Sequence, residues 1–282
     1  MMRPSTLIRF TLCVVLALSL PGCKTVGGWF GGDREDRIEK LEVEQLYSEA
    51  KENLRDGDYS SANRMYTRLI ARFPFGPYSE QSQLELTYVL YKQGKPDDAT
   101  AAIDRFIRTF PRHPHIDYAY YLKAVINFDR NVGVMSRLFR TDPSVRDLNG
   151  PTISFNDFNE VLRRYPNSIY AADARQRMVF LRNELARHEL VVGLYYLRRG
   201  AWVSAANRGK YLLENYPQSE YEGDAIALMA ASYTKLGQTA LAEDSRRVLE
   251  KNYPQHPYLQ GKWPNSKGFL RKLNPFSGEY IN

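Results

Sequence analysis

Cysteine and long apolar segments are both scarce in this sequence. Two cysteines among 282 residues exclude a scaffold held together by several disulfides. The mean hydropathy of −0.49 excludes a protein with many membrane-spanning helices. Hydrophobic residues nevertheless make up 43% of the chain and charged residues 25%. Because this composition can bury a core, we expect a folded protein rather than a disordered chain.

Motifs of enzymes and metal sites are missing as well. The sequence contains neither HExxH nor GxSxG, the patterns of zinc peptidases and serine hydrolases. His113 and His115 flank Pro114, but no carboxylate or cysteine stands at metal-ligand spacing, so we interpret them as loop residues. Asp97 and Asp98 stand at the start of a predicted helix, where the helix dipole favours acids. We therefore expect no metal and no enzymatic activity.

The one marked apolar run lies at the N-terminus and is typical of an export signal. Arg3 and Arg9 precede the apolar segment 12–20. This segment is too short to span a membrane. The run ends in Leu-Pro-Gly-Cys at residues 20–23, which resembles the lipobox of bacterial lipoproteins. The sequence therefore predicts a signal peptide over residues 1–22, cut before Cys23. The resemblance implies an N-palmitoyl and an S-diacylglycerol lipid on Cys23, and we expect no other cofactor.

A tether follows the predicted lipid anchor. Residues 23–42 include the Gly-rich segment 27–32 and are predicted to form a flexible linker. Lys24, rather than an aspartate, follows the cysteine. By resemblance to the sorting rules of lipoproteins, this residue implies the outer membrane.

The rest of the chain contains a repeat built around an aromatic–Pro pair. Gly or Asn stands seventeen residues before each proline, and Ala or Ser stands twelve residues before it. We interpret each unit as a helical hairpin, in which Gly or Asn ends the first helix and proline stops the second. In the second unit Ala99, Ile103, Phe106 and Phe110 share one helix face, which predicts a buried stripe. The pairs are Phe73-Pro74, Phe110-Pro111, Tyr165-Pro166, Tyr216-Pro217 and Tyr253-Pro254.

This arrangement resembles the tetratricopeptide repeat. Because one hairpin cannot bury its apolar face alone, the hairpins are expected to stack into an all-α solenoid of about five units. We divide the chain into N-terminal repeats over residues 43–166 and a long helix with C-terminal repeats over residues 167–254. The hairpins are predicted near residues 43–74, 78–111, 115–166, 186–217 and 220–254.

Three segments depart from the repeat. Residues 131–150, with Gly133, Pro143 and Asn149-Gly150, are predicted to be a loop on one rim of the solenoid. Residues 168–199 contain no proline and only one glycine, Gly193, so we expect one long helix or two nearly continuous ones. Residues 255–282 are basic and punctuated by Gly and Pro, which favours an irregular tail.

Positive charge is concentrated in one part of the chain. Residues 163–210 hold ten basic and three acidic residues. A solvated helix face explains most charge runs, but this excess favours an acidic partner. We do not expect nucleic acid to be that partner, because an exported lipoprotein rarely meets it and no nucleic-acid-binding motif is present.

Several blocks of sequence resemble one known family. Residues 72–79 read RFPFGPYS, residues 101–108 read AAIDRFIR and residues 113–118 read HPHIDY. Further blocks are YPNS at 165–168 and RGAWV at 199–203. Together they resemble the lipoprotein family of the outer-membrane β-barrel assembly complex. The resemblance implies a non-enzymatic subunit that faces the periplasm, docks the POTRA domains of the barrel subunit BamA beside other lipoproteins of the complex, and receives unfolded β-barrel precursors.

The resemblance also implies which residues meet these partners. Trp202, Asn207 and Arg208 belong to the BamA-docking region, with Arg208 in a salt bridge to an acidic POTRA residue. An aromatic pocket beside an arginine would suit a precursor segment that ends in an aromatic and a carboxylate. Each tyrosine proposed for that pocket can instead pack between stacked hairpins. The precursor-binding candidates are Phe75, Tyr78, Tyr88, Tyr91, Arg105 and Tyr118.

Two other functions remain open from the sequence. A tetratricopeptide-repeat lipoprotein can instead be a scaffold that coordinates cell-wall synthesis or division. The third possibility is an enzyme built on a helical solenoid, such as a wall-degrading lyase. The lack of a cleft module with a catalytic acid disfavours this last function.

Overall fold

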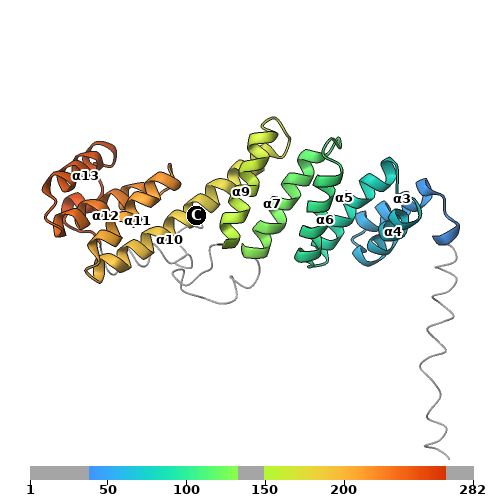
Figure 1. The fold of residues 1–282 in the computed structure, drawn as a ribbon, viewed down its shortest axis with the longest axis horizontal. Coiled ribbons are helices and arrows are strands. Elements are labelled where there is room, and N and C mark those ends of the chain that lie inside the picture. Colours follow the sequence, from blue (N-terminus) through green and yellow to red (C-terminus); the bar gives the residue numbers. More distant parts are fainter. Residues whose placement is uncertain (1–37, 133–148, 265–282) are drawn as a thin grey trace, which may run out of the picture. The chain divides into compact units, whose positions relative to one another are not determined.

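The computed structural model describes residues 38–132 and 149–264, and all regular structure within these ranges is helical (Figure 1). The predicted signal peptide, Cys23 and the tether up to residue 37 lie outside the described residues. The helices are α3 (Val43–Arg55), α4 (Tyr59–Arg72), α5 (Pro77–Lys92), α6 (Pro96–Thr109), α7 (Ile116–Val132), α9 (Asn149–Arg164), α10 (Ala171–Arg198), α11 (Trp202–Asn215), α12 (Glu222–Lys235), α13 (Thr239–Asn252) and the 3₁₀ helix η2 (Pro257–Gln260).

The helix bounds confirm the predicted tetratricopeptide-type hairpins. Gly57, Gly94, Gly200 and Gly237 each follow the first helix of a hairpin with φ between +71° and +78°. Glycine adopts this left-handed conformation without a steric penalty, so the chain can turn back at these positions. The second helix ends where the aromatic residue meets proline, because proline has no N–H to continue the hydrogen-bond pattern.

The third repeat differs from the prediction in its middle. Asn149 was expected to end the first helix, as glycine does elsewhere, and the loop was expected to reach residue 150. The structure instead places Asn149, the first described residue of α9, within a helix. The rest of the predicted insertion, residues 133–148, lies outside the described residues.

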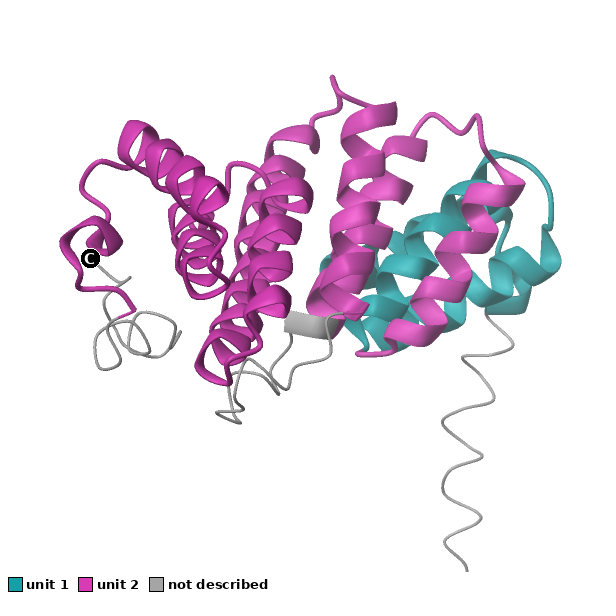
Figure 2. Cartoon of the chain, turned by 60° about the vertical axis from the view of Figure 1, so that its left-hand side comes forward, with its two compact units in different colours: residues 1–93 teal, residues 94–282 magenta. Residues whose placement is uncertain are grey.

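The chain forms two compact units, residues 1–93 and residues 94–282 (Figure 2). The module boundary predicted at residue 166 falls inside the second unit. In that unit α10 packs against α9, α11 and α12. Its 28 residues form one continuous helix, which confirms the expectation for residues 168–199. Because α10 contributes buried side chains to two neighbouring hydrophobic clusters, it joins the repeats on either side.

The first unit has its own core around Tyr66. The side chains packed there come from α3, α4 and α5. Ile38 and Leu41 also pack on this core, and the Arg72 Nη1 donates to the Ile38 carbonyl at 3.0 Å. The predicted flexible tether therefore ends earlier than residue 42, because apolar side chains in its last residues cover the end of the core. The buried members are Leu46, Ala50, Ala62, Met65, Tyr66, Leu69 and Val89.

The chain beyond residue 254 also differs from the prediction of an irregular tail. η2 follows α13 directly, and Trp263 packs on two hydrophobic clusters of the second unit. Residues 257–260 are therefore helical rather than irregular, and the half-buried Trp263 fixes the chain after them, although this segment shows no helical periodicity. Residues 265–282 lie outside the described residues.

Candidate partner-binding site

The outer face of α11 presents apolar side chains to solvent. Val203, Asn207 and Tyr211 follow each other at four-residue spacing, so they lie on one helix face. Val203 is 59% exposed and Tyr211 is 44% exposed. Trp202, at the first position of α11, is 36% exposed. The opposite face is packed inside the unit and consists of Ala205, Ala206, Gly209 and Leu212. We call the exposed residues Trp202, Val203, Asn207 and Tyr211 the α11 stripe.

Arg208 lies beside this stripe and is held by an acid of the same chain. Its Nη1 donates to Oε2 of Glu189 at 2.8 Å. The Glu189 side chain is 6% exposed, whereas that of Arg208 is 39% exposed. This hydrogen bond raises the pKa of the Arg208 guanidinium above its ordinary value. A predicted docking residue is thus already engaged in an ion pair between α10 and α11.

A glycine on α10 makes this pairing possible. A Cβ placed on Gly193 would lie 3.2 Å from Cβ of Arg208 and 2.4 Å from Cδ2 of Leu228. Only glycine leaves room for α11 and α12 to pack this closely on α10. Because Glu189 precedes Gly193 by four residues, both face the same side of α10.

The C-terminal end of α10 also presents an aromatic and a cationic side chain, Tyr195 and Arg199. Tyr195 is 47% exposed, and the Arg199 guanidinium lies 5.4 Å from the centre of its ring. Aromatic residues and arginine are the side chains that dominate protein interfaces. This arrangement can bind a partner that carries both an apolar side chain and a carboxylate.

Salt bridges within the chain neutralise much of the basic stretch at residues 163–210. The sequence count therefore overstates the charge that this stretch offers to a partner. Arg198 and Arg199, immediately before α11, are exposed and keep the end of α10 positive. The internal pairs are Arg163 and Arg164 with Glu160, Arg177 with Asp173, Arg187 with Glu184, Arg208 with Glu189, and Lys210 with Glu214.

Three residues of this site, Val203, Tyr211 and Glu189, were not predicted from the sequence. Val203 and Tyr211 are apolar at positions out of phase with the buried residues of α11, which is a readable signal of an exposed apolar face. Glu189 is an acid in the phase of the buried residues Leu185 and Ala186 of α10. Such an acid needs a partner, but its spacing does not reveal which residue that is.

Four of the predicted precursor-binding residues lie in the first unit. Phe75 is 90% exposed in the turn before α5. Tyr78 is half-buried, with its ring centre 5.3 Å from that of Tyr47. Tyr88 and Tyr91 are half-buried, with ring centres 6.2 Å apart. The three tyrosines are therefore half-buried in ring contacts, and their role in precursor binding stays a prediction, while Phe75 is available to a partner.

The carboxylate of Glu85, whose side chain is 13% exposed, holds two tyrosines of this unit. Tyr66 Oη donates to Glu85 Oε2 at 2.5 Å, and Tyr47 Oη donates to Glu85 Oε1 at 3.0 Å. Gln81 Nε2 adds a hydrogen bond of 2.9 Å to Oε1. Burial, followed by the bond to Glu85, raises the pKa of Tyr66 far above its ordinary value. Both hydroxyls therefore stay protonated as donors, which fixes the Tyr47 ring against Tyr78.

Arg105 and Tyr118 belong to the second unit. Arg105 is exposed on α6. Tyr118 is half-buried on α7, and its ring centre lies 5.3 Å from that of Tyr170. A shared pocket made by all six candidates stays a prediction.

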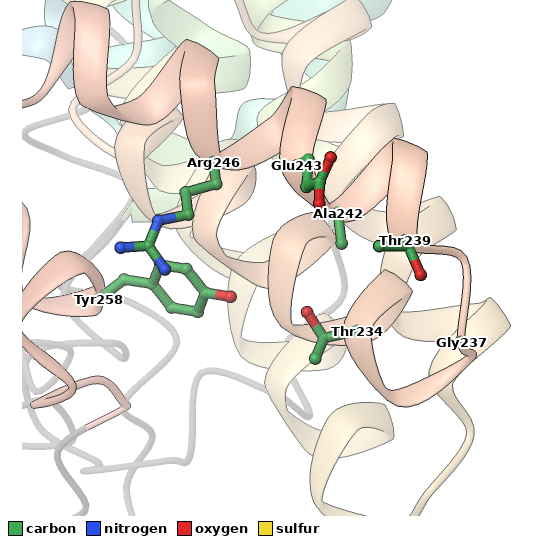
Figure 3. Close-up of a pocket in the computed structure, with 7 residues that line it drawn as sticks. All are labelled: Thr234, Gly237, Thr239, Ala242, Glu243, Arg246 and Tyr258. Carbon is green, nitrogen blue, oxygen red and sulfur yellow. The ribbon is translucent and has the colours of Figure 1, made fainter.

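A pocket elsewhere in the second unit involves none of the predicted site residues (Figure 3). Its volume of about 230 Å³ is below the roughly 300–1,000 Å³ of sites for small ligands. Arg246, on its rim, is paired with Glu250 at 2.9 Å. The lining residues are Thr234, Gly237, Thr239, Ala242, Glu243, Arg246 and Tyr258.

The described residues contain neither a candidate metal-ion site nor a candidate membrane-spanning helix. Residues 38–132 and 149–264 contain no group of three His, Cys, Asp or Glu side chains placed to hold a metal ion. In the same ranges no helix has the length and apolarity needed to cross a membrane.

Comparisons with known proteins agree on one family. Residues 39–249 match YfiO, described as outer membrane lipoprotein. The outer membrane protein assembly factor BamD of Xylella fastidiosa strain 9a5c is 46% identical over 96% of this chain and 92% of its own length. The protein of the same name from Neisseria meningitidis serogroup B is 39% identical over 90% of this chain and 95% of its own length. The protein of the same name from Vibrio cholerae is 36% identical over 86% of this chain and 98% of its own length.

A solved structure was also matched. The TPR domain of P58(IPK) aligns with 77% of this chain and 52% of its own, with a TM-score of 0.37 and 12% identity. The assignment of the repeat rests on the hairpins of this chain and not on that alignment.

Proposed function

The chain belongs to the YfiO family of outer-membrane lipoproteins, and we propose that it is a non-enzymatic assembly factor of the outer membrane. It docks the POTRA domains of BamA beside other lipoproteins of the complex and receives unfolded β-barrel precursors. A lipid on Cys23 holds it at the outer membrane, facing the periplasm. The names of the relatives, outer membrane protein assembly factor, support the assembly role.

The α11 stripe with Arg208 is the observation that carries the docking proposal. Trp202, Val203 and Tyr211 are large apolar side chains left in water on one helix. Burying them against a partner would release that surface from water. The half-exposed Arg208 can bind a carboxylate at the edge of the same stripe, and charge-assisted hydrogen bonds of this kind are short and strong.

The exposed ring of Phe75 supports the precursor part of the proposal. A nearly fully exposed phenylalanine has no packing role in its own unit, so binding is the function open to it. A precursor segment with an aromatic end can stack on this ring, because aromatic pairs add specific geometry to apolar burial.

A tagged pull-down from gently solubilised envelopes tests the docking proposal. We expect a barrel protein with POTRA domains at near-equal amount. Recovery of cell-wall synthases or division proteins in its place would contradict the proposal and favour the cell-wall scaffold.

Two valine variants localise the docking surface in the same experiment. Val203→Asp places a charge on the α11 stripe and should lower recovery of the barrel protein several-fold. Val248→Asp, on α13, is the matched control, since Val248 is also half-exposed at 46%. Equal recovery with both variants would exclude the α11 stripe as the docking surface.

A further inference from the structure

The two charged groups of the ion pair between α10 and α11 differ in their exposure to solvent. Arg208 is accessible, but the acid that holds it is buried. We propose that Glu189 is the positioning residue for docking, and that it fixes the Arg208 guanidinium in the orientation that receives the partner's carboxylate. This inference rests on the proposed docking function.

The geometry leaves the outer part of the guanidinium available. Arginine carries five N–H donors in a rigid planar fork. Oε2 of Glu189 takes up one edge of the fork through Nη1 at 2.8 Å. Tyr196 is a second partner of the guanidinium, and the side chain is still 39% exposed. The same guanidinium can therefore bind Glu189 on its inner side and a second carboxylate on its outer side.

Positioning matters because an exposed arginine would otherwise sample many rotamers. Ordering such a side chain on binding costs conformational entropy. The bond to Glu189 orders Arg208 before the partner arrives. Gly193 fixes the distance between the helices, since Arg208 Cβ lies only 3.2 Å from the position of a Cβ there. The backbone and the carboxylate together define where the guanidinium lies.

The buried position of Glu189 makes this arrangement stable. A carboxylate that is only 6% exposed needs a close counter-ion, because an unpaired buried charge is costly. His188 Nδ1 lies 4.0 Å from Oε1, which is too far for a hydrogen bond. Arg208 is the cation within hydrogen-bond distance of Glu189. Rotation of Arg208 away from Glu189 would therefore leave a buried charge poorly compensated.

A double-mutant cycle tests the inference on the full mature chain in detergent. The probe is the purified POTRA array of the cognate barrel subunit, and the measurement is the dissociation constant. Arg208→Ala should weaken binding by about 30-fold, the size expected for loss of one interfacial charge contact. Glu189→Ala should weaken binding to a similar extent. The double variant should bind no more weakly than either single variant, because both changes remove the same contact.

A conservative variant separates positioning from folding. Glu189→Gln keeps an acceptor oxygen at the position of Oε2, so binding should recover to within about threefold of the parent chain, a difference below 1 kcal/mol. Glu184→Ala is the matched control, because it breaks another ion pair of α10, the 3.0 Å contact with the buried Arg187. It should lower the melting temperature without changing the dissociation constant.

The outcomes distinguish the docking role of Arg208 from the positioning role of Glu189. Unchanged binding by Arg208→Ala would reject the docking function itself. Weak binding by Arg208→Ala with normal binding by Glu189→Ala would reject the positioning role alone. The positioning role would also be rejected if the double variant lost affinity by the product of the two single losses. It would be rejected as well if Glu184→Ala weakened binding as much as Glu189→Ala does.

Discussion

Trp263 donates its indole N–H to Oδ1 of Asp224 at 2.6 Å. The bond joins the chain beyond the last repeat to the first turn of α12. Nε2 of His256 lies 3.3 Å from the same oxygen. Gly223 leaves the space for this contact, since a Cβ there would lie 3.2 Å from Cδ2 of His256. Residues 255–264 therefore cover the end of the last hairpin, where a solenoid needs a cap.

Shortening the chain tests this cap. A chain that ends at residue 264 should melt like the full chain, because it keeps Trp263. A chain that ends at residue 254 should lose about 3 kcal/mol of stability in its last repeat, as for loss of a packed aromatic residue. That loss corresponds to roughly 6–12 °C in the melting temperature. Equal melting of the two shortened chains would contradict the role of Trp263.

Removal of the Glu85 carboxylate should destabilise the first unit. Glu85→Ala leaves the hydroxyls of Tyr47 and Tyr66 without their acceptor, and such groups cost about 1–3 kcal/mol when buried. Urea unfolding followed by tyrosine fluorescence measures the loss. Glu52→Ala, at an exposed position of α3, is the control and should stay within about 0.5 kcal/mol of the parent chain. A loss no larger than that of the control would show that the carboxylate does not organise the tyrosines.

The N-cap of α4 should make stability depend on acid pH. The Ser61 side chain and then its backbone N–H, which donates to Oδ1 of Asp58 at 3.0 Å, lower the pKa of Asp58. The ionised cap is therefore fully present above the ordinary aspartate pKa of about 3.9. It is lost as the pH falls through the lower pKa of the folded state.

Asp58→Asn provides the comparison, because asparagine caps helices without titrating. The variant should match the parent chain in melting temperature at pH 7. At about pH 3 and below, it should become the more stable of the two, since protonation weakens the parent cap. A constant difference between the two melting curves at all pH values would argue against an ionised cap.

Gly209 should not tolerate a side chain. A Cβ at this position would lie 2.8 Å from the Ala225 carbonyl oxygen and 2.8 Å from Cγ of Met229. Gly209→Ala should therefore force α11 and α12 apart and cost about 1–3 kcal/mol, measured by thermal melting. Ser204→Ala, at an exposed position of the same helix, should change the melting temperature little. A stabilising effect of Gly209→Ala, as helix propensity alone predicts, would contradict this close packing.

Loss of the predicted lipid should release the protein from the membrane. Cys23→Ser removes the sulfur that the sequence predicts to carry the lipid. The variant should move from the membrane fraction to the periplasmic fraction, measured by fractionation and immunoblotting. Continued membrane association after extraction of peripheral proteins with high salt would refute the lipid anchor.

The sequence by itself determined the repeats, because their signals are local. A glycine with positive φ and a proline after an aromatic residue act within one or two turns of the chain, so Gly57 and Pro74 mark the ends of their helices without reference to the rest of the fold. The length of α10 was predictable for the same reason, since no proline interrupts it. Asn149 shows the limit, because the same spacing there lies within a helix.

Only the tertiary structure decided which charges meet and which segments are covered. Glu189 and Arg208 are 19 residues apart and lie on different helices, and Trp263 reaches Asp224 over 39 residues. Neither spacing carries a periodic signal, because such contacts depend on how the helices pack. The burial of Glu189 follows from the close approach at Gly193. For this reason the family resemblance could propose Arg208 as a docking residue, whereas its buried ion-pair partner Glu189 became visible only in the folded chain.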